Sequence, residues 1–338
     1  MIELAGYGPE EPVVVGVRQG DGPPEFVSHA PLTADTIVYI ASLGKQITAA
    51  CAAMLVRDGR LDVDSTLARW MPELPGWAGR VRVRHLIHHT GGLPDVADFY
   101  ELQRQGLDHT TDRVVAALAH SEHLIATPGT EHRYCNAGYV CLAVVVERAS
   151  GRPLPEFARE HLFEPLGMAG TCFWPGPAAH PPEAYPLDPQ HPAPLSLGDG
   201  GVWSTAADLL RWNQAAVDLL HANQAGDQAA VALGGTKGLT AQGYHWRGPD
   251  AAQGYHWREM HTAGRLDDGT DLDYGWGVGL RATPAGVRVY RHGGSWAGLT
   301  AQLVRIPERR AHFVVLALDN DGARTNALTD TLIGELTR

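Results

Sequence analysis

The sequence predicts an α+β fold in which helices flank one antiparallel sheet, and a mostly helical domain interrupts that sheet. Three observations predict it. Strand-like segments lie near both termini, helical periodicity dominates the middle, and 338 residues exceed the usual domain length of about 150. We therefore expect a discontinuous sheet domain made from residues 1–64 and 271–338. We expect residues 65–270 to form the helical domain, with an insertion at about 215–270.

The first elements follow from apolar patterning and turn residues. Strands are expected at Val13–Arg18 and Glu25–His29, because glycine, aspartate and proline separate two short runs of strand-forming residues. A helix is expected from Ser42 to about Arg57, where apolar residues recur at spacings of three and four, and Gly59 ends it. This helix is apolar on nearly all sides, so we expect it to be buried.

The later elements follow the same logic. Gly138–Arg148 is expected to be a helix that stops at Gly151, and the proline-rich residues 174–198 an irregular crossing. Near the end of the chain the period becomes two, and a closing helix follows at about 323–336. The expected strands there are Val287–Arg291, Leu299–Ile306 and Ala311–Leu318.

Composition narrows the class of protein. The net charge of −11 argues against nucleic acid as the main partner, because phosphate binding needs a basic face. No apolar run approaches the roughly 20 residues of a membrane helix. Four cysteines in a chain of this length do not make a disulfide scaffold, and the first residues lack the positive charge of a signal peptide. We expect a cytoplasmic protein that acts on a small molecule or short peptide and binds neither nucleic acid nor membrane.

One internal repeat stands out. Ala241–Arg247 recurs as Ala252–Arg258, and the intervening glycines and proline favour a loop insertion. Two interpretations remain open. The repeat is a tandem duplication in a surface loop, or it is an aromatic lid in which Tyr244 and Trp246 bind substrate.

The two lysines carry the strongest chemical signal. Only Lys45 and Lys237 occur in a chain with 27 basic residues, and eight serines would give a Ser-x-x-Lys only about 0.05 times by chance. Ser42 and Lys45 form such a pair, one helical turn apart. A lysine can lose its proton in a dry site, whereas an arginine cannot. Free N–H groups at the helix start favour negative charge beside Ser42. The pair therefore indicates a nucleophile and a base; the plainer interpretation is a surface lysine at a helix start.

With this pair in place, the chain resembles the serine β-lactamase and penicillin-binding-protein superfamily, whose first motif is Ser-x-x-Lys. A second motif matches Tyr134-Cys135-Asn136, and a third matches His292-Gly293-Gly294. The likeness is nearest to the class C branch, which includes esterases, D-aminopeptidases and DD-peptidases. It covers about Thr33–Asn320 without the region 215–270. Further similar stretches are His85–Asp95, Tyr134–Met168, Gly200–Trp212 and Tyr274–Leu280.

The resemblance implies a β-lactamase/transpeptidase-like fold and a role for each motif residue. Ser42 would form an acyl-enzyme. Lys45 and Tyr134 would share the proton transfers, and which of them is the base stays open. Asn136 would hold a substrate amide or orient Lys45, and His292 would lie beside Tyr134 and tune its proton transfer. The plainer interpretations of Tyr134, Asn136 and His292 are a core tyrosine, a turn asparagine and a strand-end histidine.

The resemblance also implies a binding site around the third motif. The backbone N–H groups of Ser42 and Ser295 would form the oxyanion hole, and Gly293 and Gly294 would contact the substrate. The third motif lacks the lysine and the hydroxyl residue that engage a substrate carboxylate in β-lactamases. We therefore expect weak or no β-lactamase or carboxypeptidase activity, and a preference for esters or for amides without a free carboxylate.

Two other outcomes of the same site stay open. An acyltransferase would pass the acyl group to an amine or alcohol, and a sensor module would bind it without turnover. No cofactor or metal is expected. His85, His88 and His89 lack the spacing of hydrolytic metal sites. Cys135 should alternate away from its two neighbours in the second motif, so a catalytic thiol is not expected.

Overall fold

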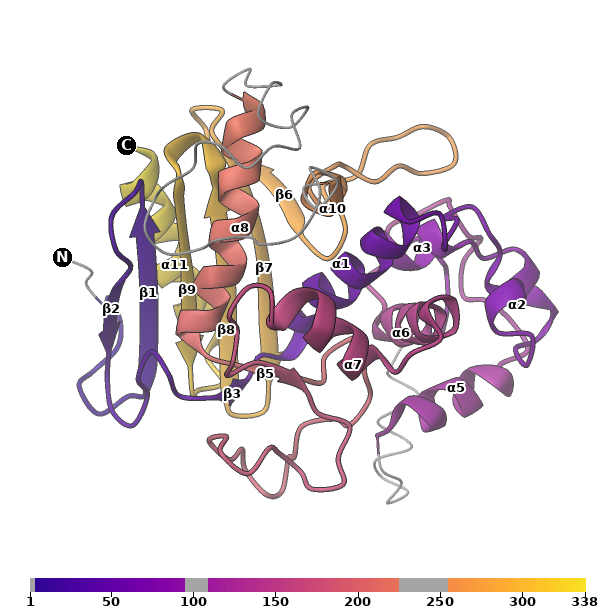
Figure 1. The fold of residues 1–338 in the computed structure, drawn as a ribbon, viewed down its shortest axis with the longest axis horizontal. Helices are drawn as coiled ribbons and strands as arrows, with labels where there is room; N and C mark the ends of the chain where they lie inside the picture. Colours follow the sequence, from indigo (N-terminus) through magenta and orange to yellow (C-terminus); the bar gives the residue numbers. More distant parts are fainter. Residues whose placement is uncertain (1–3, 95–108, 225–254) are drawn as a thin grey trace.

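A computed structural model describes residues 4–94, 109–224 and 255–338. Its main feature is a six-stranded antiparallel sheet in the order β2-β1-β9-β8-β7-β6, built from both ends of the chain (Figure 1). This confirms the expected α+β class and the pairing of N-terminal with C-terminal strands. The strands are β1 Val13–Gln19, β2 Glu25–Ser28, β6 Gly279–Ala282, β7 Arg288–Trp296, β8 Leu299–Ile306 and β9 Ala311–Ala317.

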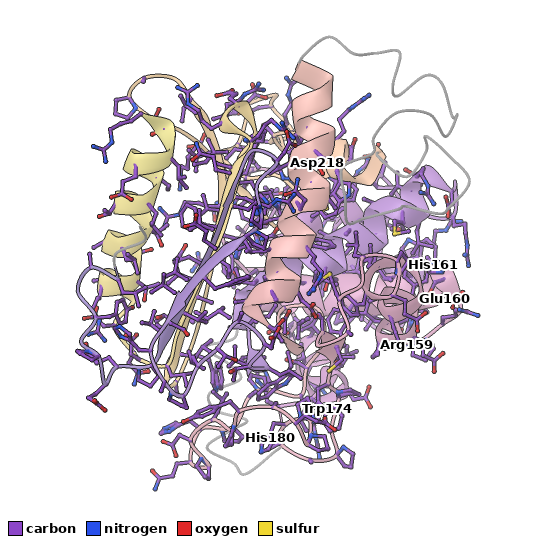
Figure 2. The ribbon with its side chains drawn as sticks, turned by 60° about the vertical axis from the view of Figure 1, so that its left-hand side comes forward. Arg159, Glu160, His161, Trp174, His180 and Asp218 are labelled. Carbon is purple, nitrogen blue, oxygen red and sulfur yellow. The ribbon has the colours of Figure 1, made fainter. Side chains whose placement is uncertain are left out.

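Helices cover both faces of the sheet. Figure 2 shows the sheet between α11 (Gly322–Thr337) on one side and α8 (Ala206–Gln224) on the other. Successive side chains of a strand point to opposite faces, so each strand serves two layers. In β9, Phe313 packs in the cluster that contains Leu328 of α11, whereas Val314 packs in the main core with α8. Packing on both faces therefore fixes the position of the central strands.

Helices and a small second sheet form the rest of the molecule (Figure 1). Helix α1 (Gly44–Arg57) packs against α6, α7 and α10, and its residues from Gly44 to Leu55 are all buried, as expected. Gly59, at φ +67°, supplies the left-handed conformation that follows this helix. The other elements are α2 Leu67–Trp70, η2 Gly76–Gly79, α3 Val83–Ile87, α5 Thr111–Ala119, α6 Asn136–Ser150, α7 Leu154–Ala158, η3 Arg159–Phe163, β3 Val38–Tyr39, β4 Cys172–Phe173 and β5 Val202–Ser204.

Strand β7 differs from its prediction. The expected strand Val287–Arg291 ends too early, because β8 pairs with every residue from Tyr290 to Trp296 and carries β7 through the third motif. Strand β6 was not predicted. The two-domain division stays a prediction; α8, from the middle of the chain, packs on the sheet and also contacts α10 (Tyr255–Met260).

The repeat also differs from its prediction in the part that the structure describes. The end of the second copy begins helix α10 (Tyr255–Met260) instead of forming a loop. Trp257 is buried, and its ring lies 4.4 Å from the ring of Trp212 in an edge-to-face contact. Trp257 is therefore a core residue and not part of a lid, and the expectation of an exposed loop was wrong here. Tyr244 and Trp246 lie outside the described residues.

Within the described ranges, no helix combines the length and the apolar character that a membrane span requires. Between β8 and β9, the turn η5 (Pro307–Arg309) closes the hairpin.

Candidate active site

The turn that contains Ser42 has a strained backbone and is held in place by strand β7. Ser42 lies in the 3-10 turn η1 (Ala41–Leu43) between β3 and α1. Ala41 before it has φ +47°, a conformation that costs an L-residue free energy and persists only where neighbours enforce it. Strand β7 supplies one such neighbour. A Cβ added to Gly294 would lie 2.5 Å from the carbonyl oxygen of Ile40, so only glycine permits this approach. The half-buried Ser42 is thus held in one position.

Lys45 lies in the first turn of α1 and is fully buried. Its Nζ lies 3.0 Å from Ser42 Oγ, 2.7 Å from Asn136 Oδ1 and 2.6 Å from the carbonyl oxygen of Asp199. These acceptors come from three parts of the chain, and the last two are 91 and 154 residues away. All three are neutral oxygens. The predicted pair therefore exists, and a buried amine connects it to the second motif.

The second motif lies at the start of α6. Asn136 is the first residue of that helix, which explains how its side chain reaches Lys45. Tyr134 precedes the helix, is 38% exposed, and its ring centroid lies 4.9 Å from Lys45 Nζ. An ammonium at that distance is attracted to the ring face. The structure thus brings Ser42, Lys45, Tyr134 and Asn136 together as the sequence predicts.

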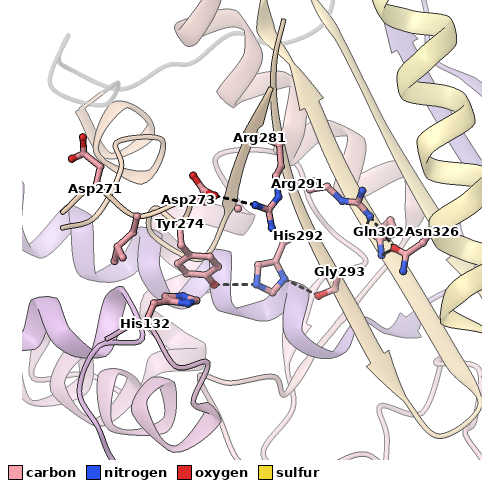
Figure 3. A pocket seen from close by; sticks show the side chains of 12 residues that line it. His132, Asp271, Asp273, Tyr274, Arg281, Arg291, His292, Gly293, Gln302 and Asn326 are labelled. Carbon is pink, nitrogen blue, oxygen red and sulfur yellow. Dashed lines mark hydrogen bonds and ion pairs between the residues drawn. The ribbon is translucent and has the colours of Figure 1, made fainter. Parts of the chain in front are cut away.

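His292 on β7 completes this group with both ring nitrogens occupied. Its Nδ1 lies 2.7 Å from the carbonyl oxygen of Gly293, so Nδ1 carries the proton, and its Nε2 accepts from the Tyr274 hydroxyl at 3.0 Å (Figure 3). Burial, with a smaller contribution from Lys45, lowers the pKa of His292 to about 4, so the ring is neutral near pH 7. Its centroid lies 6.2 Å from that of Tyr134. The proximity agrees with expectation, but the nitrogen that could accept a proton faces Tyr274.

Tyr274 is the functional residue that sequence reasoning missed. It was noted only within the stretch Tyr274–Leu280, and nothing in its spacing links it to His292. No sequence signal could have found it, because the burial that obliges its hydroxyl to find a hydrogen-bond partner appears only in the folded chain.

Ser295 follows the third motif on β7 and is exposed. Among the described residues, β6 pairs only with Arg288–Arg291 of β7, so the end of β7 lies beyond the reach of β6. This end packs against η1 instead: the position of a Cβ on Gly294 is 3.4 Å from the backbone nitrogen of Ser42. Ser42 and Ser295 therefore lie on two elements in direct contact. That the backbone N–H groups of Ser42 and Ser295 together form an oxyanion hole stays a prediction.

A polar cavity of about 740 Å³ opens beside His292 (Figure 3). Gly293 lines it, and the expected contact of Gly293 with substrate stays a prediction. Two arginines also line it, and both are already ion-paired, Arg281 with Asp273 at 3.3 Å and Arg291 with Asp330 at 2.9 Å. The complete lining is His132, Asp271, Leu272, Asp273, Tyr274, Gly279, Arg281, Arg291, His292, Gly293, Gln302 and Asn326.

The three neighbouring histidines make structural contacts. His85 Nδ1 accepts from the backbone N–H of Arg82 at 3.1 Å, and His88 Nδ1 lies 3.2 Å from the carbonyl oxygen of Gly275. His89 Nδ1 accepts from the backbone N–H of Cys135 at 3.1 Å. In the described part of the chain, no group of three or more histidine, cysteine or acidic side chains could hold a metal ion.

Comparisons with known proteins identify the family of the chain. The family described as Beta-lactamase matches residues 12–338. Penicillin-binding protein 4* of Bacillus subtilis is 26% identical over 316 residues, which cover 87% of this chain and 63% of that protein. Esterase EstB of Burkholderia gladioli is 30% identical over 203 residues, which cover 54% of this chain and 50% of EstB. The chain therefore spans between half and two thirds of the length of these relatives.

A solved structure shows the same fold. A class C beta-lactamase superposes with a TM-score of 0.70 and 18% identity, over 94% of this chain and 89% of that one. The chain belongs to the beta-lactamase family. The family and the β-lactamase/transpeptidase-like fold that the motifs indicated are confirmed.

Proposed function

We propose that this protein is a serine hydrolase that cleaves an ester or amide of a small molecule or short peptide through an acyl-enzyme on Ser42. The observation that carries the proposal is the hydrogen bond between Lys45 Nζ and Ser42 Oγ at 3.0 Å inside a buried polar cluster. Membership of the beta-lactamase family supports it, and so does the likeness to a protein named as an esterase.

The contacts of Lys45 suit proton transfer. An ammonium donates three hydrogen bonds, and three acceptors surround this one. A neutral amine has two N–H bonds and one lone pair. Asn136 Oδ1 and the Asp199 carbonyl can take the two N–H bonds, which leaves the lone pair aimed at the Ser42 hydroxyl. The same geometry therefore serves both protonation states of Lys45.

The reaction follows in two halves. Lys45 or Tyr134 takes the Ser42 proton while Oγ attacks the acyl carbon, and the carbonyl π electrons move to the oxygen, which the N–H groups of Ser42 and Ser295 would stabilise. When the tetrahedral intermediate collapses, the bond to the leaving group breaks and the leaving group takes the proton. Water then attacks the acyl-enzyme with the same proton acceptors, releases the acid and restores Ser42.

The third motif favours substrates without a free carboxylate. His292 is neutral near pH 7, because burial lowers its pKa to about 4, so it offers no cation where β-lactamases place a lysine. The charges of Arg281 and Arg291 are engaged by Asp273 and Asp330.

The decisive experiment is covalent labelling of Ser42. A fluorophosphonate should modify the wild type at Ser42 and abolish p-nitrophenyl ester hydrolysis, and Ser42→Ala should neither react nor turn over. Full labelling and turnover by Ser42→Ala would refute the proposal. A panel of esters, D-amino-acid amides and a chromogenic cephalosporin then ranks the substrates, and we expect the cephalosporin to be the poorest.

No observation favours the two alternatives. A dry cleft lined by the aromatic residues of 244–257 would favour an acyltransferase, but Trp257, the one of them whose side chain the structure describes, is buried against Trp212. Added amine or alcohol acceptors would reveal transfer as a new acylated product. A non-turnover sensor would release one equivalent of product and then stop.

A further inference from the structure

His89 contacts the residues of the second motif, and neither the proposed catalysis nor a metal site explains these contacts. It is 1% exposed and lies between α3 and the segment before α6. Its φ is +55°, in the left-handed region that non-glycine residues rarely adopt. Such strain persists only where surrounding contacts enforce it, and it clusters at functional sites. The contacts of His89 therefore indicate which function requires this strained backbone conformation.

The main contacts all converge on Tyr134. The carbonyl oxygen of His89 accepts from the backbone N–H of Arg133 at 2.8 Å, and its Nδ1 accepts from the backbone N–H of Cys135 at 3.1 Å. A single residue thus binds the peptide groups on both sides of Tyr134. The His89 ring also lies 4.3 Å from the Tyr134 ring, centroid to centroid, tilted by 34°. The left-handed backbone lets the carbonyl and the imidazole of His89 face the same segment.

We propose that His89 is a positioning residue that fixes the Tyr134 phenol against Ser42 and Lys45. Tyr134 needs such support, because it precedes α6 and its side chain is 38% exposed. The supporting ring is itself fixed by Tyr139 and Tyr274, whose centroids lie 4.9 and 5.0 Å away. The shortest ring-to-ring distance of His89 among the described residues is the one to Tyr134, so it acts on the proton-transfer residue.

The protonation state of His89 agrees with this role. Since Nδ1 accepts the Cys135 N–H, the ring is neutral and its proton is on Nε2. Burial, and then the charge of Lys45, lower the pKa of His89 well below its usual value. Proton transfer by His89 itself would need a partner at Nε2, and this buried nitrogen has no hydrogen-bond partner among the described residues. The residue therefore supports Tyr134 rather than exchanging protons with it.

The test is the rate of Ser42 labelling by a fluorophosphonate in His89→Gly and His89→Asn. Both replacements tolerate the left-handed backbone, and both remove the ring beneath Tyr134. A displacement of about 1 Å in a catalytic group costs on the order of 100-fold in rate, so we expect labelling and kcat to fall by about that factor with little change in KM. Added imidazole should raise the labelling rate of His89→Gly by refilling the cavity.

The matched control is His85→Asn, a buried histidine of the same segment whose bonds go to Arg82 and Asp267. It should label at the wild-type rate. The endpoint separates positioning from folding. Loss of position slows labelling but leaves one label per chain, whereas misfolding lowers the endpoint at an unchanged rate per active site. If His89→Gly does not fold, His89→Asn decides.

The inference rests on the proposed function, and the same assay tells the two failures apart. A wild type that is not labelled at Ser42 overturns the proposed function. A labelled wild type with His89 variants that react equally fast overturns only the role of His89. Equal slowing by His85→Asn also overturns it, because the effect would then be general to buried histidines of this segment.

Discussion

Replacing Lys45 by methionine should abolish catalysis while leaving the fold nearly intact. Methionine matches the length of the lysine stem and removes the ammonium that contacts Ser42, Asn136 and Asp199. Two acceptors, Asn136 Oδ1 and the Asp199 carbonyl, then lose a donor at a cost of about 1–3 kcal/mol each. The same substitution removes a buried ammonium, and taking an ion out of water costs several kcal/mol, so this part of the change is stabilising. The two effects are opposite in sign and similar in size.

The expected result is therefore a small change in stability and a large one in rate. Loss of a general base or acid costs about 10²- to 10⁴-fold, so kcat/KM for a p-nitrophenyl ester should fall by that factor. Urea unfolding should show a free energy of unfolding within about 2 kcal/mol of the wild type, the difference left when the two effects nearly cancel. Near-wild-type turnover by Lys45→Met would refute the assigned role of the amine.

A double variant sharpens this test. Residues that act as one unit are not additive in their effects on rate. Ser42→Ala combined with Lys45→Met should therefore be no slower than Ser42→Ala alone. A further loss in the double variant would show that Lys45 contributes independently of Ser42.

Three further predictions follow from the site and its supports. Tyr274→Phe leaves the buried Nε2 of His292 without its donor, so the free energy of unfolding should fall by about 1–3 kcal/mol; equal urea midpoints for variant and wild type would contradict this. Gly294→Ala places a methyl group 2.5 Å from the carbonyl oxygen of Ile40 and should slow Ser42 labelling. The control is Gly334→Ala, on an open face of α11. It should label at the wild-type rate and raise the free energy of unfolding by about 0.5–1 kcal/mol. Burial lowers the pKa of His88 and His292 to about 4 and that of His312 to about 3, from 6.5. As the pH falls, the unfolded chain binds these protons before the folded chain does. The free energy of unfolding should therefore be highest above pH 6.5 and fall between pH 6.5 and 4, by up to about 1.4 kcal/mol per pH unit for each group. A urea midpoint that stays constant over that range would rule this out.

The elements that the sequence located are those whose signals are local. The spacing of Ser42 and Lys45 fixes their contact, because side chains three residues apart on a helix share a face. Strands β8 and β9 and helices α1, α6 and α11 lie close to their expected ranges, since apolar periodicity reports which residues face a core. Local signals failed at β7, because its expected end at Arg291 is overridden by pairing with β8 as far as Trp296.

The motifs predicted which residues meet, but not how they meet. The third motif placed His292 beside Tyr134. The packing of β7 against the segment that contains Tyr274 directs Nε2 of His292 to the Tyr274 hydroxyl instead. The third acceptor of Lys45 is a backbone carbonyl, and a carbonyl has no residue type by which sequence could identify it.

Sequence alone therefore indicated Ser42 and Lys45, one helical turn apart, because residue type and short spacing encode that pair directly; the two distant motifs that meet it followed from the resemblance to the family. Tertiary structure decided the hydrogen-bond directions of His292, the support of Tyr134 by His89 and the burial of Trp257. Each of these depends on side-chain orientation and on contacts between distant segments. Such contacts form only when the helices and the sheet pack, because packing fixes the rotamers that carry them.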